Sequence, residues 1–109
     1  MIYEVEVSKQ ADSDLRGIFE YIAFELQSPE NASGQLDRLE EQILSLDTMP
    51  ERYRKYEKEP WKSRGLRVLP VDNYVVLYIP DSDKKVVTIL RVMYAGRDID
   101  NQLNFHTKQ

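Results

Sequence analysis

The chain begins with alternating apolar and polar positions and then changes to a helical period. In residues 2–7, IYEVEV, the apolar side chains that begin at Tyr3 fall on one face and the two Glu side chains on the other. This alternation predicts a strand with one solvated side. Ser8 follows as a candidate N-cap, because its hydroxyl can accept a hydrogen bond from a free amide at a helix start.

Two amphipathic helices are predicted next, since apolar residues recur at steps of three and four from residue 11 to 26 and again from residue 32 to 46. Ser28 is placed to cap the second helix, and Pro29 to occupy its first turn, where the missing N–H costs nothing. So short a connection makes the two helices antiparallel neighbours.

Residues 51–63 show neither period and are predicted to form a basic, aromatic loop. Three strands follow, and the last two are apolar on both faces, as expected for strands that are buried on both sides. A turn of Pro, Asp and Ser joins them into a hairpin. The predicted strands are 65–71, 74–79 and 86–93.

The element order β-α-α-β-β-β predicts an α+β domain. In it, an antiparallel helical hairpin packs on one face of a small, mostly antiparallel sheet, which buries both helical stripes. A chain of 109 residues fits a single domain. We expect that domain to span residues 1–103 and residues 104–109 to form a frayed C-terminal tail.

Charge is unevenly distributed, although the formal net charge is only -4. Residues 1–50 carry 3 basic and 11 acidic side chains, whereas residues 51–67 carry 7 basic and 3 acidic ones. Residues 68–109 carry five of each. The acidic total argues against a nucleic-acid partner, but the middle block is a positive segment that could face a polyanion.

The chain has no Cys and a single His, His106. It can form neither a disulfide nor a thiolate or imidazole cluster, and we expect no metal and no cofactor. No apolar run approaches the roughly 20 residues that cross a bilayer, and the N-terminus lacks a signal-peptide pattern. We expect a cytoplasmic protein without a membrane partner and with His106 on its surface.

The segment GLRVLPVDNYVVLYIPDSDKKVVTILRVMYAGRDID resembles the C-terminal half of RelE/ParE superfamily toxins, which belong to bacterial type II toxin–antitoxin modules. The segments VEVSKQADSDLRGIFEYIA and SPENASGQLDRLEEQILSL resemble the family's first strand and its two helices. The resemblance extends from about Tyr3 to Asn101. It implies a growth-inhibiting toxin of the plasmid-stabilisation type, which a cognate antitoxin neutralises.

Two mechanisms occur in this superfamily. RelE-like members are metal-independent endoribonucleases that cleave mRNA on the ribosome, whereas ParE-like members inhibit DNA gyrase. Val75 stands beside Tyr74 where RelE-like nucleases usually carry an arginine, and the two long helices are closer to the ParE-like pattern. The resemblance therefore favours gyrase as the target, with mRNA cleavage as the alternative. A non-toxic protein-binding module on the same scaffold is a further alternative.

Metal-free RNA cleavage needs side chains that deprotonate the 2′-hydroxyl, neutralise the phosphate charge and protonate the leaving oxygen. If the protein is a nuclease, the candidates are Arg67, Tyr94 and Arg97. Arg97 lies in a Gly-Arg-Asp element, where the resemblance places a phosphate-facing arginine. The structural alternative is that Arg97 pairs with Asp98 or Asp100.

The other two candidates have structural alternatives as well. Arg67 alternates with Leu66 and Val68, so it projects from the open face of the sheet if the helices cover those two residues. There it could also form an ordinary surface salt bridge. Tyr94 could transfer a proton or stack on a base, or it could simply be an amphipathic packing residue.

Arg91 lies inside an apolar strand, in register with Ile89 and Met93. A cation at such a position requires a partner. The pattern favours a structural pair with an acidic residue over a catalytic role.

The basic segment alternates cations with Tyr53, Tyr56 and Trp61, which suits phosphate neutralisation combined with base stacking. Aromatic side chains that anchor a loop to the core beside solvated cations would give the same pattern. The cations could equally receive acidic parts of an antitoxin. The candidate target-binding residues are Arg52, Arg54, Lys55, Lys58, Trp61, Lys62 and Arg64.

Overall fold

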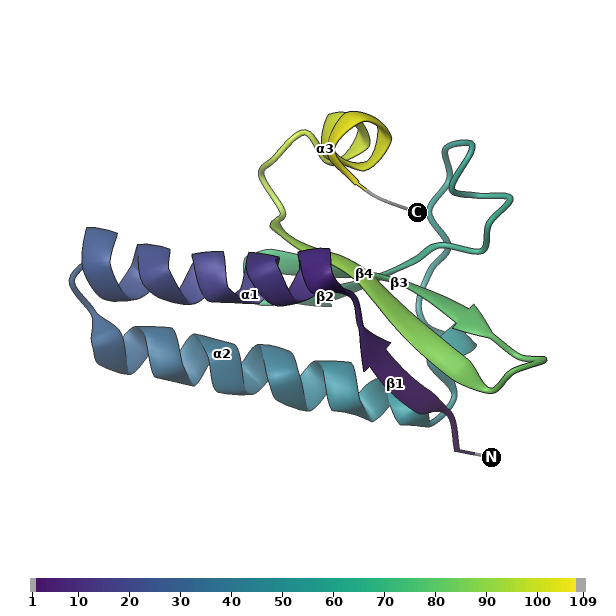
Figure 1. Ribbon diagram of the computed structural model, residues 1–109, viewed down its shortest axis with the longest axis horizontal. Helices are drawn as coiled ribbons and strands as arrows, with labels where there is room; N and C mark the ends of the chain where they lie inside the picture. The colour runs from purple at the N-terminus through teal and green to yellow at the C-terminus, as the bar shows by residue number, and fades with distance from the viewer. Residues whose placement is uncertain (1, 108–109) are drawn as a thin grey trace.

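The computed structural model describes residues 2–107 and confirms the α+β order of elements (Figure 1). A π-helical turn, Tyr21–Glu25, extends the first helix, and short 3-10 turns at Ser45–Asp47 and Pro50–Arg52 follow the second helix. The helices and strands are β1 Glu4–Val7, α1 Lys9–Glu20, α2 Pro29–Leu44, β2 Arg67–Val71, β3 Tyr74–Asp81, β4 Val86–Tyr94 and α3 Ile99–His106.

The four strands form one mixed sheet in the order β1-β4-β3-β2. β1 pairs in parallel with the first half of β4, with Val7 opposite Ile89. The other two pairs are antiparallel, and Tyr74 lies opposite both Val71 and Tyr94. β3 and β4, which the sequence predicts to be buried on both faces, are the two inner strands.

The first helix starts where the sequence predicts it to start. The Ser8 hydroxyl oxygen accepts a hydrogen bond from the Ala11 amide at 3.0 Å and donates one to the Leu90 carbonyl at 3.0 Å. Pro29 occupies the first turn of α2 as expected, but the Ser28 side chain makes no capping hydrogen bond. The cap of α1 therefore also joins the helix to β4.

The helical hairpin buries its apolar stripes against one face of the sheet, as predicted. Because the stripes recur on one side of each helix, both helices can contact the same layer. This first core joins Ala11, Leu15, Leu39, Ile43 and Leu46 to Leu69, Val71, Val76, Tyr78, Val87, Ile89 and Val92.

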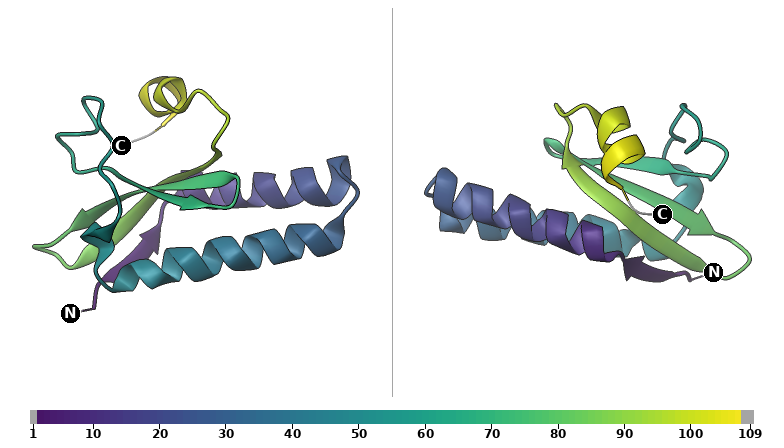
Figure 2. Two further views of the ribbon diagram at one scale, coloured as in Figure 1. Left: turned by 180° about the vertical axis from the view of Figure 1, so that it is seen from behind. Right: turned by 45° about the horizontal axis from the view of Figure 1, so that its top comes forward.

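A second core lies on the opposite face of the sheet, as expected for inner strands that are buried on both sides. α3 and the loop that precedes β2 cover this face (Figures 1 and 2). Its buried side chains are Trp61, Leu66, Val68, Val75, Leu77, Leu90, Met93 and Leu103. The molecule therefore has three layers, namely the helical hairpin, the sheet, and a layer of α3 with the loop.

The C-terminal tail differs from its prediction. Residues 104–106 do not fray but complete α3, and Leu103 anchors this helix in the second core. The His106 side chain is exposed, as expected. Residues 108–109 of the predicted tail lie outside the described residues.

A bulge in β4 corrects the predicted register of Arg91. Leu77 lies opposite Arg91, whereas the next residue, Tyr78, lies opposite Ile89, so Leu90 is the extra residue. Ile89 therefore belongs to the first core and Leu90 to the second. Arg91 does not share a face with Ile89, contrary to the simple alternation.

Candidate functional site

A groove of about 1010 Å³ lies where the helical hairpin extends beyond the sheet. Figures 1 and 2 show both helices continuing past the turn that joins β2 and β3. The overhanging part has its own small core around Ile22, Ala23 and Ala32. Residues that line the groove include Gly17, Tyr21, Leu26, Gln35, Arg38, Asn73, Tyr74, Tyr94 and Arg97.

Three tyrosines gather at this groove. The rings of Tyr74 and Tyr94, which lie opposite each other in the β3–β4 pair, meet edge to face with centroids 6.0 Å apart. Burial raises the pKa of the Tyr74 phenol, and the nearby phenols of Tyr21 and Tyr94 add to the rise. The Tyr74 phenol is therefore a neutral hydrogen-bond donor at neutral pH, and the Tyr94 ring beside it presents an aromatic face to the groove.

Arg97 shares the groove with Tyr94, so two of the three predicted catalytic residues lie together. Neither acidic neighbour holds Arg97. The Asp98 carboxylate accepts the Asn101 amide at the start of α3, and the Asp100 carboxylate binds Lys58 and the Tyr56 hydroxyl. The Arg97 side chain is exposed and available to an anionic ligand.

Gly96 permits the close approach of the Tyr94 ring to the turn that carries Arg97. A Cβ at this position would lie 2.5 Å from Cε2 of Tyr94, so any other residue would displace the ring. Tyr94 itself is 54% exposed. The Ala-Gly-Arg turn thus sets the position of Tyr94 as well as that of Arg97.

On the α2 side, a polar cluster around Asp72 closes the groove. Arg38 Nε and Gln35 Nε2 donate hydrogen bonds to the Asp72 carboxylate at 2.8 and 3.0 Å. These two bonds, that of Arg38 first, lower the pKa of Asp72. Asp72 has a φ of 55° in the β2–β3 turn, a conformation in which Asp is one of the better-tolerated residues.

Arg67, the third predicted catalytic residue, does not join the other two. It lies opposite Tyr78, at the far end of β2 from the groove, about 13 Å away by four residues of strand rise. Its Nη1 donates to the Glu51 carbonyl at 2.9 Å and to the Tyr53 carbonyl at 2.7 Å. Arg67 therefore organises the loop.

Arg67 would lie on the open face of the sheet if the helices covered Leu66 and Val68, and this condition is not met either. Leu66 and Val68 pack into the second core, and Leu69, two residues after Arg67, packs under the helical hairpin. Arg67 thus belongs to the side of the sheet that the helices cover. The alternation of residues is confirmed, but the helices cover the face of Arg67 and not the face of Leu66 and Val68.

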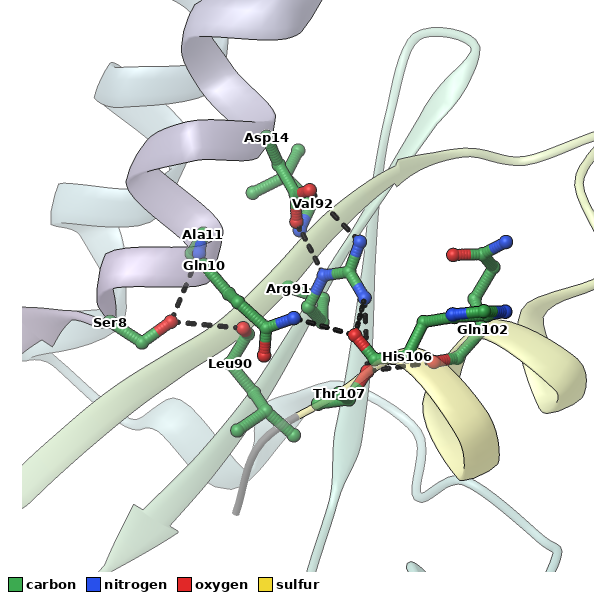
Figure 3. Close-up of polar contacts among 10 residues, drawn as sticks. All are labelled: Ser8, Gln10, Ala11, Asp14, Leu90, Arg91, Val92, Gln102, His106 and Thr107. Carbon is green, nitrogen blue, oxygen red and sulfur yellow. Dashed lines mark hydrogen bonds and ion pairs between the residues drawn. The ribbon is translucent and has the colours of Figure 1, made fainter.

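Arg91 forms the structural ion pair that the sequence favours (Figure 3). Its Nε and Nη2 donate to the two oxygens of Asp14 at 2.7 and 2.9 Å. Asp14 also accepts the backbone N–H of Val92 at 3.0 Å, because β1 has ended and no longer pairs with that edge of β4. Arg91 Nη1 donates to the carbonyl of His106 and the hydroxyl of Thr107, so one side chain joins α1, β4 and the end of α3.

Within the basic segment, three of the predicted target-binding residues have structural roles. Arg52 donates to the carbonyl groups that follow α2, and Lys58 pairs with Asp100. Trp61 is only 2% exposed, and its Nε1 donates to Asn104 at 2.9 Å. Trp61 is therefore unavailable for the predicted stacking on a base.

The remaining cations of the segment, Arg54, Lys55, Lys62 and Arg64, are exposed. The Arg64 guanidinium lies 5.0 Å from the centre of the Trp61 ring. The loop therefore combines an aromatic anchor, as the structural interpretation predicts, with cations that remain open to a partner.

Within residues 2–107, no group of three or more His, Cys, Asp or Glu side chains is placed to hold a metal ion. The helices in this part of the chain are too short or too polar to cross a membrane. Among the described residues, the groove offers tyrosine hydroxyls, aromatic faces, side-chain amides and the exposed Arg97 guanidinium, beside an Arg38 that is paired with Asp72.

Comparison with solved structures gives 18 similar chains, including the following three. A chain of the chromosomal ParDE system from P. aeruginosa matches with a TM-score of 0.71 and 20% identity, over 85% of this chain and 96% of that one. A chain of the RelBE2 toxin–antitoxin complex from Mycobacterium tuberculosis matches with a TM-score of 0.64 and 23% identity, over 86% of this chain and 99% of that one. A mutant of the E. coli toxin RelE in the free state matches with a TM-score of 0.65 and 16% identity, over 91% of this chain and 90% of that one.

A search of curated protein sequences gave no significant match. The model of one protein family, described as the ParE toxin of the type II toxin–antitoxin system parDE, matches residues 5–99. These residues include both helices of the hairpin, all of β2, β3 and β4, and Arg97. The chain is therefore a member of the ParE toxin family, within the RelE/ParE superfamily of type II toxins.

Proposed function

We propose that this protein arrests growth as the toxin of a toxin–antitoxin module and that a cognate antitoxin neutralises it. Membership of the ParE toxin family supports this proposal. Similar chains occur in the ParDE system from P. aeruginosa and in the RelBE2 complex from Mycobacterium tuberculosis. The groove beside the helical hairpin offers a partner both apolar and polar contacts.

The target that we propose is DNA gyrase, as in ParE-like toxins. The observation that carries this choice is the separation of Arg67 from Tyr94 and Arg97, because a metal-free nuclease needs its charged and proton-transferring groups around one phosphate. Arg67 is held by backbone carbonyls at the other end of the sheet. Val75, which stands where RelE-like nucleases usually carry an arginine, is buried in the second core.

Ribosome-dependent mRNA cleavage is the second candidate. The presence of Tyr74, Tyr94 and Arg97 in one groove favours it, since these groups could stack on a base, donate a proton and stabilise a phosphate. Of the two arginines among the described residues that line the groove, Arg38 is paired with Asp72 and Arg97 forms no salt bridge. One such arginine makes a weaker electrostatic site for a phosphate than several converging cations.

The first experiment is inducible expression of the chain in a bacterial host. We expect growth arrest, which co-expression of the small reading frame that adjoins the toxin gene relieves. Normal growth with abundant, folded soluble protein would contradict a toxic function and support a non-toxic binding module on the same scaffold.

The second experiment separates the two targets with one protein preparation. We expect inhibition of gyrase supercoiling and no new cleavage sites when translated mRNA is mapped by primer extension. If cleavage is found, Arg97→Ala is expected to reduce it by about 10²–10³, whereas the matched control Lys84→Ala, in the turn between β3 and β4, leaves it unchanged. Cleavage with that pattern would replace gyrase with mRNA as the target.

A further inference from the structure

Four exposed cations that precede β2 form no salt bridge within residues 2–107, although one of them, Lys62, interacts electrostatically with the Glu59 carboxylate of the same loop. We call Arg54, Lys55, Lys62 and Arg64 the basic edge. We infer that the basic edge is a docking surface for an extended, acidic segment of the antitoxin. This inference rests on the proposed function for the existence of that partner, and adds the place and the chemistry of the contact.

The backbone of the basic edge is prepared to pair with an extended chain. The Val68 amide donates to the Arg54 carbonyl at 3.0 Å, and the Tyr56 amide donates to the Leu66 carbonyl at 2.8 Å. These bonds make a short antiparallel extension of the sheet, centred on a bridge at Lys55. Because the polar groups of consecutive strand residues point to opposite sides, the N–H and C=O of Lys55 point away from β2. An added strand can pair there, which brings its side chains beside those of Arg54 and Lys55.

The aromatic side chains of the loop are engaged in ways that disfavour a nucleic-acid strand. Trp61 is buried and bonded to Asn104, the Tyr56 hydroxyl bonds to Asp100, and Tyr53 lies under the Arg52 guanidinium at 4.7 Å. Sequence-independent binding of single strands relies on stacking of bases on exposed aromatic rings. Cations without such rings match a chain of carboxylates better.

The rest of the molecule directs an acidic segment to this edge. Residues 1–50, which include β1 and the helical hairpin, carry a net charge of -8 from 3 basic and 11 acidic side chains. Figure 2 shows the loop and the hairpin on opposite sides of the sheet. A segment rich in Asp or Glu is therefore repelled from the hairpin side and attracted to the loop side.

The test uses a fluorescein-labelled decapeptide of alternating Glu and Thr, with an oligouridylate decamer as the nucleic-acid probe. Fluorescence anisotropy is measured with the purified full chain at about 50 and about 200 mM salt. We expect the peptide to bind more tightly than the RNA and more weakly at the higher salt. Arg54→Glu/Lys55→Glu should weaken peptide binding by roughly tenfold or more.

The matched control is Lys9→Glu/Lys84→Glu, which makes the same change in net charge at exposed positions outside the basic edge. We expect it to weaken peptide binding by less than about threefold. Circular dichroism of both variants checks that they fold. Equal losses in the two folded variants, absence of peptide binding, or tighter binding of the RNA would each overturn the inference. The growth-arrest experiment tests the proposed function separately, because it needs no peptide.

Discussion

Removing the carboxylate of Asp14 should destabilise the fold far more than removing an exposed one. In Asp14→Ala, Arg91 loses the acceptors of two hydrogen bonds at 2.7 and 2.9 Å, and the Val92 amide loses its acceptor at 3.0 Å. Arg91 is only 6% exposed, and loss of one partner of a buried pair costs about 3–5 kcal/mol. Because Arg91 keeps its bonds to His106 and Thr107, we expect the free energy of unfolding to fall by about 3 kcal/mol, which corresponds to a fall in Tm on the order of 10 °C.

The assay is urea unfolding followed by circular dichroism, with Asp12→Ala as the matched control. Asp12 lies on the same helix, but its pair with Arg16 is exposed, so its loss should cost at most about 0.5 kcal/mol. Replacing both buried charges, in Asp14→Leu/Arg91→Met, should recover much of the lost stability. The reasoning fails if Asp14→Ala and Asp12→Ala unfold at the same urea concentration.

Three further predictions concern other parts of the molecule. Burial raises the pKa of Tyr78 to about 12 from 10.0, so the unfolded state loses the phenol proton at a lower pH than the folded state does. The free energy of unfolding should therefore fall between pH 10 and 12, and urea titrations of Tyr78→Phe should show a smaller fall. Iodide should quench the fluorescence of the buried Trp61 only weakly. Quenching should be stronger in Asn104→Ala, which removes the acceptor of the Trp61 Nε1 hydrogen bond, and equal quenching in the variant and the original protein would contradict the packing of α3. In thermal melts, Gly17→Ala should stabilise the protein by about 0.5–1 kcal/mol, because Ala is the better helix former. Gly65→Ala, at a φ of 83°, should destabilise it by about 1 kcal/mol. Stability changes of the same sign in both variants would be inconsistent with these backbone conformations.

Two of the groove's main residues were accessible from the sequence. Tyr94 and Arg97 follow the last strand and lie in the element that carries the family resemblance. Tyr74 and Arg38 were missed as groove residues, since they are distant in sequence and belong to other elements. The hairpin register could have indicated Tyr74, because the short connection between β3 and β4 brings it opposite Tyr94.

The sequence alone determined the order of the elements, the helical hairpin and the two inner strands. Each rests on a local rule, such as the steps of three and four on the helices or the Ser8 cap. The need of a buried cation for an acidic partner likewise predicted the pairing of Arg91. These features depend on neighbours along the chain or on a single burial cost.

Which side of each strand meets the helices depends on how the whole chain packs. Alternation states that Arg67 and Val68 face opposite sides, but not which side the hairpin covers, and the bulge at Leu90 changes the alternation midway along β4. Trp61 became a core residue because α3 packs over the second face of the sheet. The arrangement of the layers depends on the total apolar area that they bury together, and that total cannot be calculated from any local stretch of the sequence.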